Sequence, residues 1–155
     1  MIPVEIPGSE PWELASLVLD FNGTLATAGI LVPGVVELLR ALSRAVTIHI
    51  LTADTYGTAR AQLEQAGLGH TLKQVHSGAD KLAYVNALDA SRVVAIGNGR
   101  NDAPMLRAAR LGIAVIGEEG AAGEALMAAD IVCRSIVDAL ALLQDPRKLV
   151  ALLRP

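Results

Sequence analysis

The residues best suited to chemistry lie together in one short stretch, Asp20-Phe21-Asn22-Gly23-Thr24-Leu25. An apolar run over 15–19 precedes it and predicts a buried strand that ends at the carboxylate. A carboxylate in that place can attack phosphorus, the glycine lets the backbone come close to a phosphate, and Thr24 can donate a hydrogen bond to a phosphate oxygen. The alternative interpretation is a strand that ends in an ordinary turn.

Three more polar stretches follow along the chain: Thr52-Ala53-Asp54, Gly78-Ala79-Asp80-Lys81 and Gly97-Asn98-Gly99-Arg100-Asn101-Asp102. The first and third come directly after apolar runs, 46–51 and 93–96, that predict strands, and the second opens a helical stretch. Ligands of open α/β sheets bind beyond the carboxyl ends of the strands. We therefore expect Asp20, Thr52 and Asn98 to lie together at that edge.

Taken in order, the four stretches resemble motifs I to IV of the haloacid dehalogenase (HAD) superfamily, and the resemblance covers about residues 16–135. The closest likeness within it is to the phosphorylation domain of P-type ATPases, whose Gly-Asp-Gly-x-Asn-Asp-Ala-Pro is similar to 97–104 here. No apolar run approaches the roughly 18 residues that span a bilayer, and no nucleotide-binding domain fits after motif I. The resemblance is therefore to soluble, P-type-ATPase-like members without a membrane partner.

The resemblance implies that Asp20 is a nucleophile that forms an aspartyl phosphate. It also implies that Lys81 neutralises the carboxylates and the phosphate, and that Thr52 holds a phosphate oxygen during catalysis. The remaining implied contacts to the substrate are Gly23, Thr24, Ala53 and Asn101. Each has a structural alternative, such as a helix cap, a strand end or a solvent-facing lysine, and Asp54 is equally well a cap of the following helix.

A divalent cation cancels charge in phosphoryl transfer of this type, and Mg²⁺ prefers hard oxygen ligands. The resemblance implies a Mg²⁺ site formed by the Asp20 carboxylate, the backbone carbonyl of Asn22, Asn98 and Asp102. Family members carry Asp at the position of Asn98. We therefore expect Mg²⁺ to bind, but more weakly than at a site with one more carboxylate.

Asn22 occupies the position at which most phosphatases of the superfamily keep a catalytic acid/base. That group protonates the leaving oxygen and later activates water, and an amide can do neither. P-type ATPases also lack it, and their aspartyl phosphate persists. We therefore expect a phosphoenzyme that forms and hydrolyses slowly, with a preference for activated esters such as aryl or acyl phosphates.

The apolar pattern predicts one domain over 1–155, an open α/β sheet of the Rossmann-like type, mostly parallel, with helices on both faces. Strands are expected to end near six residues: Asp20, Thr52, Val75, Asn98, Ile116 and Cys133. Helices are expected over six ranges: 34–44, 58–66, 80–88, 103–109, 120–128 and 137–153. Residues 1–14 are expected to add an edge strand or a hairpin.

Composition narrows the function classes. The net charge is −3 and no Lys/Arg cluster occurs, so the electrostatic footprint of a nucleic-acid-binding protein is missing. The N-terminus lacks the basic and apolar regions of a signal peptide, and the single cysteine, Cys133, reads as a small buried hydrophobe, which fits a reducing cytoplasm. The stretch Gly117-Glu118-Glu119-Gly120 is interpreted as a loop without a further role.

The spacing between motifs leaves no room for a cap domain, because Asp20 to Thr52 and Thr52 to Lys81 each hold one helix and one strand. An uncovered site stays wet, which weakens electrostatic stabilisation of phosphoryl transfer. Hydrophobic residues make up 52% of the chain, more than a small domain usually buries alone. We therefore expect a homo-oligomer, a dimer or tetramer, with a partner near 26–32.

Three functions are compatible with these residues to different degrees. The first is a Mg²⁺-dependent HAD phosphatase with weak turnover, acting on a phosphorylated small molecule or a phosphoprotein. The second is a catalytically weakened relative that binds or regulates, which both asparagine replacements favour. The third, a two-component receiver domain, is disfavoured because the key Asp ends the first long strand and is followed closely by Gly-Thr. Turnover of an aryl phosphate with Mg²⁺ separates the first two.

Overall fold

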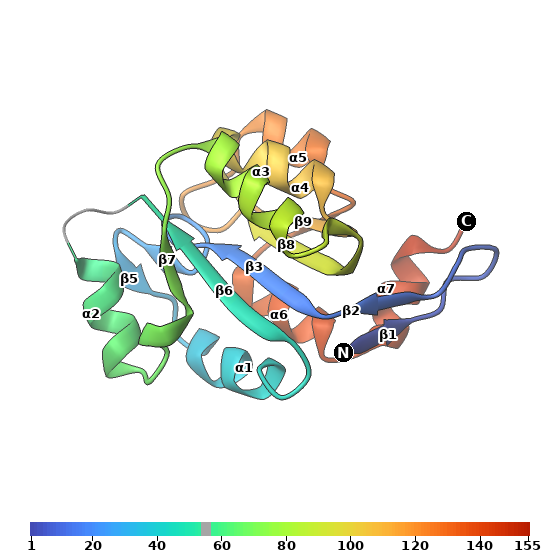
Figure 1. Ribbon diagram of the computed structural model, residues 1–155, viewed down its shortest axis with the longest axis horizontal. Coiled ribbons are helices and arrows are strands. Elements are labelled where there is room, and N and C mark those ends of the chain that lie inside the picture. Colours follow the sequence, from blue (N-terminus) through green and yellow to red (C-terminus); the bar gives the residue numbers. More distant parts are fainter. Residues whose placement is uncertain (54–56) are drawn as a thin grey trace.

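A six-stranded parallel sheet forms the centre of the computed structural model, which describes residues 1–53 and 57–155 (Figure 1). The strands lie in the order β10-β9-β8-β3-β6-β7, and all neighbouring pairs are parallel. Their bounds are β3 Ser16–Asp20, β6 Thr47–Thr52, β7 Leu72–Gln74, β8 Val93–Gly97, β9 Leu111–Val115 and β10 Ile131–Cys133. Each strand ends within one residue of its predicted end, which confirms the open, parallel sheet.

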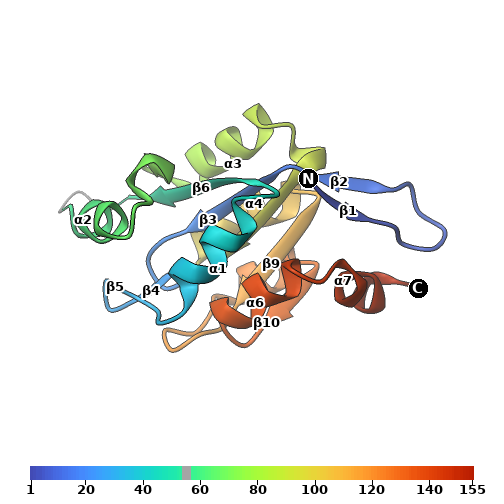
Figure 2. The ribbon, with the colours of Figure 1, turned by 90° about the horizontal axis from the view of Figure 1, so that it is seen from below.

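Helices cover both faces of this sheet, as predicted. Their bounds are α1 Val35–Leu42, α2 Thr58–Gln65, α3 Gly78–Ala87, α4 Ala103–Ala108, α5 Gly123–Ala128, α6 Ile136–Leu143 and α7 Pro146–Leu153. Short 3₁₀ helices lie at η1 Gly69–Thr71, η2 Ala90–Arg92 and η3 Arg100–Asp102. Figures 1 and 2 show α3, α4 and α5 on one face of the sheet, with α1 and α6 on the other.

The apolar strands feed two separate cores. In β3, Leu17 and Leu19 belong to the cluster shared with α1 and α6, whereas Val18 between them belongs to the cluster shared with α3, α4 and α5. All three side chains are fully buried. A strand that is buried on both faces needs a continuous apolar run rather than an alternating one, and this explains much of the high hydrophobic content.

The C-terminal segment differs from its prediction. Residues 137–153 were expected as one helix, but α6 ends at Leu143 and α7 begins at Pro146. Proline has no N–H to donate and its ring disfavours a helical residue before it, so the prediction of one helix was wrong. Asp145 instead caps α7 by accepting a hydrogen bond from the backbone N–H of Arg147.

Two small hairpins stand outside the central sheet. Strands β1 Ile2–Val4 and β2 Trp12–Leu14 pair antiparallel near the N-terminus, and β4 Ala26–Thr27 pairs with β5 Ile30–Leu31 directly after β3. Between β3 and β6, the chain adds only the β4–β5 hairpin and α1 as helices or strands, so no cap domain occurs there. In the described part of the chain, no helix is both long and apolar enough to cross a membrane.

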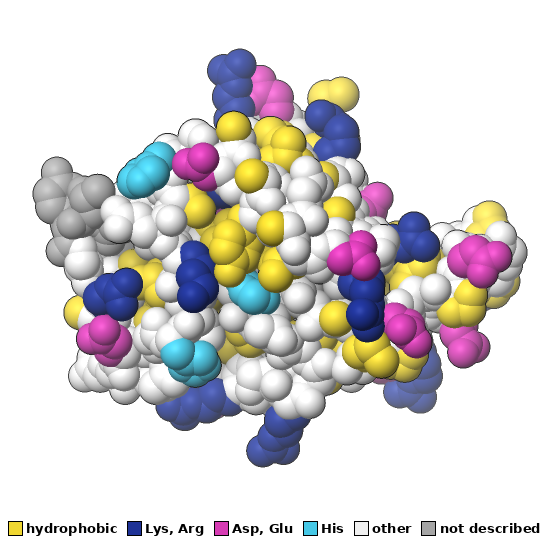
Figure 3. All heavy atoms as spheres, viewed as in Figure 1, with side chains coloured by type: hydrophobic (Ala, Val, Ile, Leu, Met, Phe, Trp, Pro, Cys, Tyr) yellow, Lys and Arg dark blue, Asp and Glu magenta, His cyan; other side chains and the backbone are white. Residues whose placement is uncertain are grey.

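Charged side chains are dispersed over the face seen in Figure 3, where basic and acidic groups alternate instead of gathering into one basic patch. This distribution agrees with the net charge of −3. An extended basic surface is the usual electrostatic basis for nucleic-acid binding, and this face does not offer one.

We expect Gly112→Ala to destabilise the fold by about 1–3 kcal/mol, the usual cost of overpacking. Gly112 lies in β9, where an added Cβ would overlap the backbone carbonyl of Leu106 in α4. Urea denaturation measures the change in the free energy of unfolding. Gly123→Ala is the matched control, because open space surrounds that position, and equal stability losses in both variants would contradict the tight packing of α4 on β9.

Candidate active site

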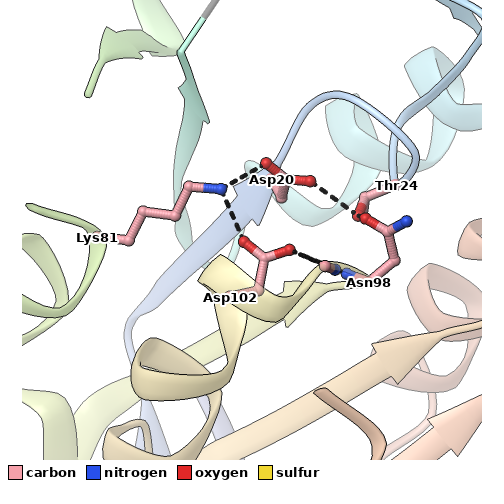
Figure 4. Close-up of polar contacts among 6 residues, drawn as sticks. Asp20, Thr24, Lys81, Asn98 and Asp102 are labelled. Atoms are coloured by element: carbon pink, nitrogen blue, oxygen red, sulfur yellow. Dashed lines mark hydrogen bonds and ion pairs between the residues drawn. The ribbon is translucent and has the colours of Figure 1, made fainter. Parts of the chain in front are cut away.

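Lys81 lies between two carboxylates at the carboxyl edge of the sheet (Figure 4). Its Nζ donates to Asp20 Oδ1 at 2.6 Å and to Asp102 Oδ1 at 2.7 Å. All three side chains are buried, with Lys81 2% exposed and Asp102 fully buried. Two negative charges and one positive charge are thus held away from water, an arrangement that is costly unless its partners satisfy one another.

Lys81 reaches the site because α3 begins close to the loop that precedes α4. Ser77 caps α3 by accepting a hydrogen bond from the backbone N–H of Asp80 at 3.2 Å. The first residue of the helix is Gly78, where a Cβ would lie 2.7 Å from the backbone oxygen of Asn101. A glycine therefore allows the close approach that places the lysine between the carboxylates.

Asp102 binds the backbone of the loop after β8 in addition to Lys81. Its Oδ2 accepts hydrogen bonds from the backbone N–H groups of Asn98 at 3.0 Å and Gly99 at 2.9 Å. A Cβ on Gly97 would lie 2.5 Å from Cγ of Asp102, so the strand must end in glycine for this carboxylate to fold back. Both oxygens of Asp102 therefore have protein partners, and its predicted role as a metal ligand remains a prediction.

Thr24 connects the nucleophile candidate to Asn98. Its hydroxyl lies 3.4 Å from Asp20 Oδ2 and 3.2 Å from Asn98 Oδ1, and it has one proton to donate to either (Figure 4). The amide nitrogen of Asn98 donates to the backbone oxygen of Gly120 at 3.2 Å, which directs Oδ1 towards Thr24. Two side-chain oxygens, from Asp20 and Asn98, thus converge on one hydroxyl.

The loop 117–120 has a role that the sequence interpretation missed. Besides the bond to the Gly120 carbonyl, the backbone N–H of Ala122 donates to the backbone oxygen of Asn98 at 2.8 Å. Gly120 at the end of the loop therefore fixes the amide of Asn98, and Ala122 two residues later fixes its backbone. Gly117 and Gly120 both have positive φ angles, 54° and 75°, and these closely spaced glycines were the only local signal of a constrained backbone.

A second missed residue is Gln62 in α2, which holds the β4–β5 hairpin. Its Oε1 accepts from the backbone N–H of Leu31 at 2.8 Å, and its Nε2 donates to the backbone oxygen of Gly29. An exposed-looking glutamine in a helix carries no sequence signal for such a contact. The hairpin follows Thr24 directly in the chain, so Gln62 helps to fix the backbone beside the site.

The structure brings some predicted residues together and leaves others apart. Five are joined by hydrogen bonds or ion pairs: Asp20, Thr24, Lys81, Asn98 and Asp102. Thr52 is buried at the end of β6, next to β3, while Asn22, Ala53 and Asn101 are exposed. Gly23 has φ +77°, and a Cβ there would meet the amide of Asn98 at 2.5 Å. The possible cap Asp54 lies outside the described residues.

The electrostatics of the cluster favour a charged lysine and a carboxyl group that titrates near neutral pH. Burial, aided by repulsion from Asp102, raises the pKa of Asp20 to about 7, although Lys81 acts in the opposite direction. Burial lowers the pKa of Lys81, but the two carboxylates outweigh this effect and the pKa is raised overall. Lys81 is therefore a permanent positive charge at neutral pH, whereas Asp20 titrates there.

A cation bound at Asp20 would find few other acidic ligands nearby. Within 1–53 and 57–155, no three acidic, histidine or cysteine side chains converge. A cation at Asp20 would therefore take its other protein ligands from amide and backbone oxygens, which Mg²⁺ accepts. The convergence of Asp20 Oδ2 and Asn98 Oδ1 on Thr24 fits such a donor set.

Without divalent cations, we expect Asp20→Asn to raise the melting temperature at about pH 8. A carboxyl whose pKa is about 7 in the folded chain, against an ordinary value of 3.8, costs stability as the pH rises through that window. The gain should be fully present above about pH 7 and disappear as the pH falls to about 4. Thermal melting in EDTA across this range measures it, at roughly 2–4 °C per kcal/mol.

Asp102→Asn is the control for that variant. It also removes one negative charge, but it places an NH₂ group or a weaker acceptor against Lys81 and two backbone N–H donors, so its melting temperature should fall. A lower melting temperature for Asp20→Asn at every pH would contradict the conclusion that the charged form of Asp20 destabilises the fold.

Comparisons with known proteins match a family model and several individual proteins. A family model described as a haloacid dehalogenase-like hydrolase matches residues 9–110. An uncharacterized protein of Methanocaldococcus jannaschii is 41% identical over 81 residues, which cover 48% of this chain and 87% of that protein. PacS of Synechocystis, a probable copper-transporting ATPase, is 36% identical over 99 residues, which cover 62% of this chain and only 13% of the ATPase.

A solved structure shares the arrangement of the elements. The 3-deoxy-D-manno-octulosonate 8-phosphate phosphatase of Moraxella catarrhalis, in complex with magnesium and phosphate ions, superposes with a TM-score of 0.73. The match covers 89% of this chain and 90% of the phosphatase, at 15% sequence identity. At this identity the likeness concerns the fold.

Proposed function

The chain belongs to the haloacid dehalogenase-like hydrolases, and from this premise we propose that it is a slow, Mg²⁺-dependent phosphatase that acts through an aspartyl phosphate on Asp20. The observation that carries the proposal is the buried Lys81, which holds Asp20 and Asp102 at 2.6 and 2.7 Å. A buried cation beside a nucleophilic carboxylate serves phosphoryl transfer, because it offsets charge that would repel a phosphate. The proposed substrate is a phosphorylated small molecule or a phosphoprotein.

The proposed reaction has two steps at Asp20. A carboxylate oxygen attacks phosphorus, the bond from phosphorus to the leaving oxygen breaks, and an aspartyl phosphate forms. Water then attacks this phosphorus, and the bond from phosphorus to the Asp20 oxygen breaks. This step releases inorganic phosphate and restores the Asp20 carboxylate. Thr24 is placed to donate to a phosphate oxygen, since its hydroxyl lies 3.4 Å from Asp20 Oδ2. Thr52, buried at the neighbouring strand end, is proposed to hold a second oxygen.

The missing acid/base is the reason for proposing a slow enzyme. Asn22 is exposed two residues after Asp20, where a carboxyl could protonate the leaving oxygen and later accept a proton from water. An amide does neither at neutral pH. Leaving groups that depart without protonation, such as aryl alcohols, are therefore the proposed best substrates.

Mg²⁺ is the proposed cofactor. It would be held by the Asp20 carboxylate, the backbone carbonyl of Asn22 and Oδ1 of Asn98. Asp102, which binds the backbone of the same loop, would add a negative charge near the ion. When bound, the ion would draw the phosphate to Asp20 and neutralise part of its charge. The chain offers one carboxylate fewer than an Asp at position 98 would provide, so the proposed affinity is low.

We expect slow hydrolysis of p-nitrophenyl phosphate by the native protein and a higher kcat in Asn22→Asp. General acid/base groups contribute about 10²–10⁴-fold, and the exposed position accepts a carboxylate without rearranging the core. Repulsion between the new carboxylate and the phosphate will reduce the gain. Steady-state kinetics with Mg²⁺ measure the difference.

Two controls define this result. Asn86→Asp makes the same chemical change at an exposed position in the last turn of α3, and it should leave the rate unchanged. Asp20→Ala should abolish turnover in both the native and the Asn22→Asp background. Activity that survives Asp20→Ala would eliminate the covalent mechanism.

Asn98→Asp should tighten Mg²⁺ binding by about tenfold, because ligand charge governs the affinity of carboxylate sites. Asn101→Asp is the matched control, since it adds a carboxylate to the same loop at an exposed position. Calorimetric titration with MgCl₂ compares the two variants without any need for turnover. An affinity that Asp20→Asn leaves unchanged would show that the site lies elsewhere.

Binding or regulation without efficient turnover is the second candidate function. The two amides, Asn22 and Asn98, favour it because they remove an acid/base and an anionic ligand from the site. Absence of hydrolysis in both the native protein and Asn22→Asp would support this alternative. A cytoplasmic location and a homo-oligomer are also part of the proposal, and Ile30, 70% exposed on the β4–β5 hairpin, offers an apolar contact for a second copy.

A further inference from the structure

A cavity of about 270 Å³ opens beside the charge cluster, between the β4–β5 hairpin and the loops that follow β9 and β10. Its lining includes Gly23, Thr24, Val32, Glu118, Arg134 and Ile136. Loops far apart in the sequence build it. Of the four motif stretches, the first alone contributes, through Gly23 and Thr24. The cavity therefore shares Gly23 and Thr24 with the proposed phosphate site and extends away from the other three motif stretches.

Thr24 is shared by the cavity and the charge cluster. Its hydroxyl lies 3.4 Å from Asp20 Oδ2, and the same residue lines the cavity wall. Gly117 also lines the cavity and has no side chain that could fill it. A group attached to a phosphate at Asp20 can therefore extend directly into this space.

The lining is apolar on one side and charged at the rim. Val32 and Ile136 supply apolar surface, whereas Arg134 and Glu118 are exposed charged residues. Among the described residues, neither charge takes part in an ion pair within 4.0 Å. An arginine with its donor fork unengaged is suited to bind a carboxylate in bidentate geometry.

The size of the cavity suits a small ligand group. Its volume of about 270 Å³ is large enough for a small organic leaving group. A small molecule with a short apolar part and a terminal anion matches both the volume and the lining.

We propose that this cavity is the subsite for the leaving group of the substrate, and that Arg134 selects small phosphate monoesters that carry a carboxylate. The inference rests on the proposed function, because it places the phosphate at Asp20. Glu118 opposes the same carboxylate and so limits the affinity. Specificity would then come from loops of the chain itself, since no cap domain lies between β3 and β6.

The test uses non-hydrolysable phosphonates, so it does not depend on turnover. Calorimetric titration in Mg²⁺ compares phosphonoacetate, 3-phosphonopropionate and 4-phosphonobutyrate with alkylphosphonates of equal length. The measured quantity is the selectivity, the ratio of the affinities of the carboxylated and uncharged ligands. We expect a selectivity of roughly tenfold or more at one chain length, the usual range for a hydrogen-bonded charge pair.

Three variants should change the selectivity in different directions. Arg134→Gln should remove it, and Glu118→Gln should increase it by about threefold, because a nearby like charge is lost. Arg154→Gln, near the C-terminus and outside the cavity lining, should leave the ratio unchanged. All three substitutions are at exposed positions, and thermal melting verifies that the variants fold.

The outcomes separate this inference from the proposed function. Selectivity that disappears in Arg134→Gln supports the subsite even if aryl phosphates are not hydrolysed, in which case the phosphatase proposal alone fails. Aryl-phosphate hydrolysis without any carboxylate selectivity overturns the subsite and leaves the phosphatase proposal standing. Selectivity that Arg134→Gln does not change also overturns it, because another group must then read the carboxylate.

Discussion

The buried ion triad of Lys81, Asp20 and Asp102 is the constraint around which the site is built. An unpaired charge in this environment would be strongly destabilising, so the buried lysine requires a carboxylate partner, while the second carboxylate is held at a cost that raises the pKa of Asp20 to about 7. The lysine satisfies one oxygen of each carboxylate at 2.6 and 2.7 Å. The remaining oxygen of Asp102 is satisfied by backbone N–H groups, which leaves Asp20 Oδ2 as the carboxylate oxygen with the weakest protein contact and the greatest freedom to react.

Parallel sheet geometry makes this triad possible. The carboxyl ends of β3 and β8 lie side by side, and α3 returns to the same edge, so residues 61 positions apart in the chain meet in one ion pair. Glycines then remove the side chains that would block the approach. A Cβ on Gly97 would lie 2.5 Å from Asp102 and one on Gly23 would lie 2.5 Å from Asn98, so each would overlap that side chain. The fold therefore brings the site residues to one edge of the sheet, and the glycines leave room for their side chains.

If Asp20 accepts a phosphate as proposed, the amides Asn22 and Asn98 would lessen the repulsion that carboxylates at these positions would exert on it. On the same proposal, they would leave the site without an acid/base and with one anionic metal ligand fewer. The cavity beside Thr24 lies in a chain that has no cap domain between β3 and β6. Selection of a substrate would then depend on short loops held by contacts such as those of Gln62 and Gly120.

The sequence alone was sufficient for the parallel sheet, the strand ends and the membership of the family, because apolar runs and strand-end polar residues are local signals. It also contained Pro146, which divides the last helix, although the apolar spacing obscured it. The tertiary structure decided how Asp102 uses its two oxygens, that the loop 117–120 holds Asn98, and that Arg134 shares a cavity with Thr24. These contacts are hydrogen bonds and a shared cavity between segments that lie far apart in the sequence. The periodicity of a sequence indicates which face of an element is buried, but it does not indicate which distant atoms come into contact.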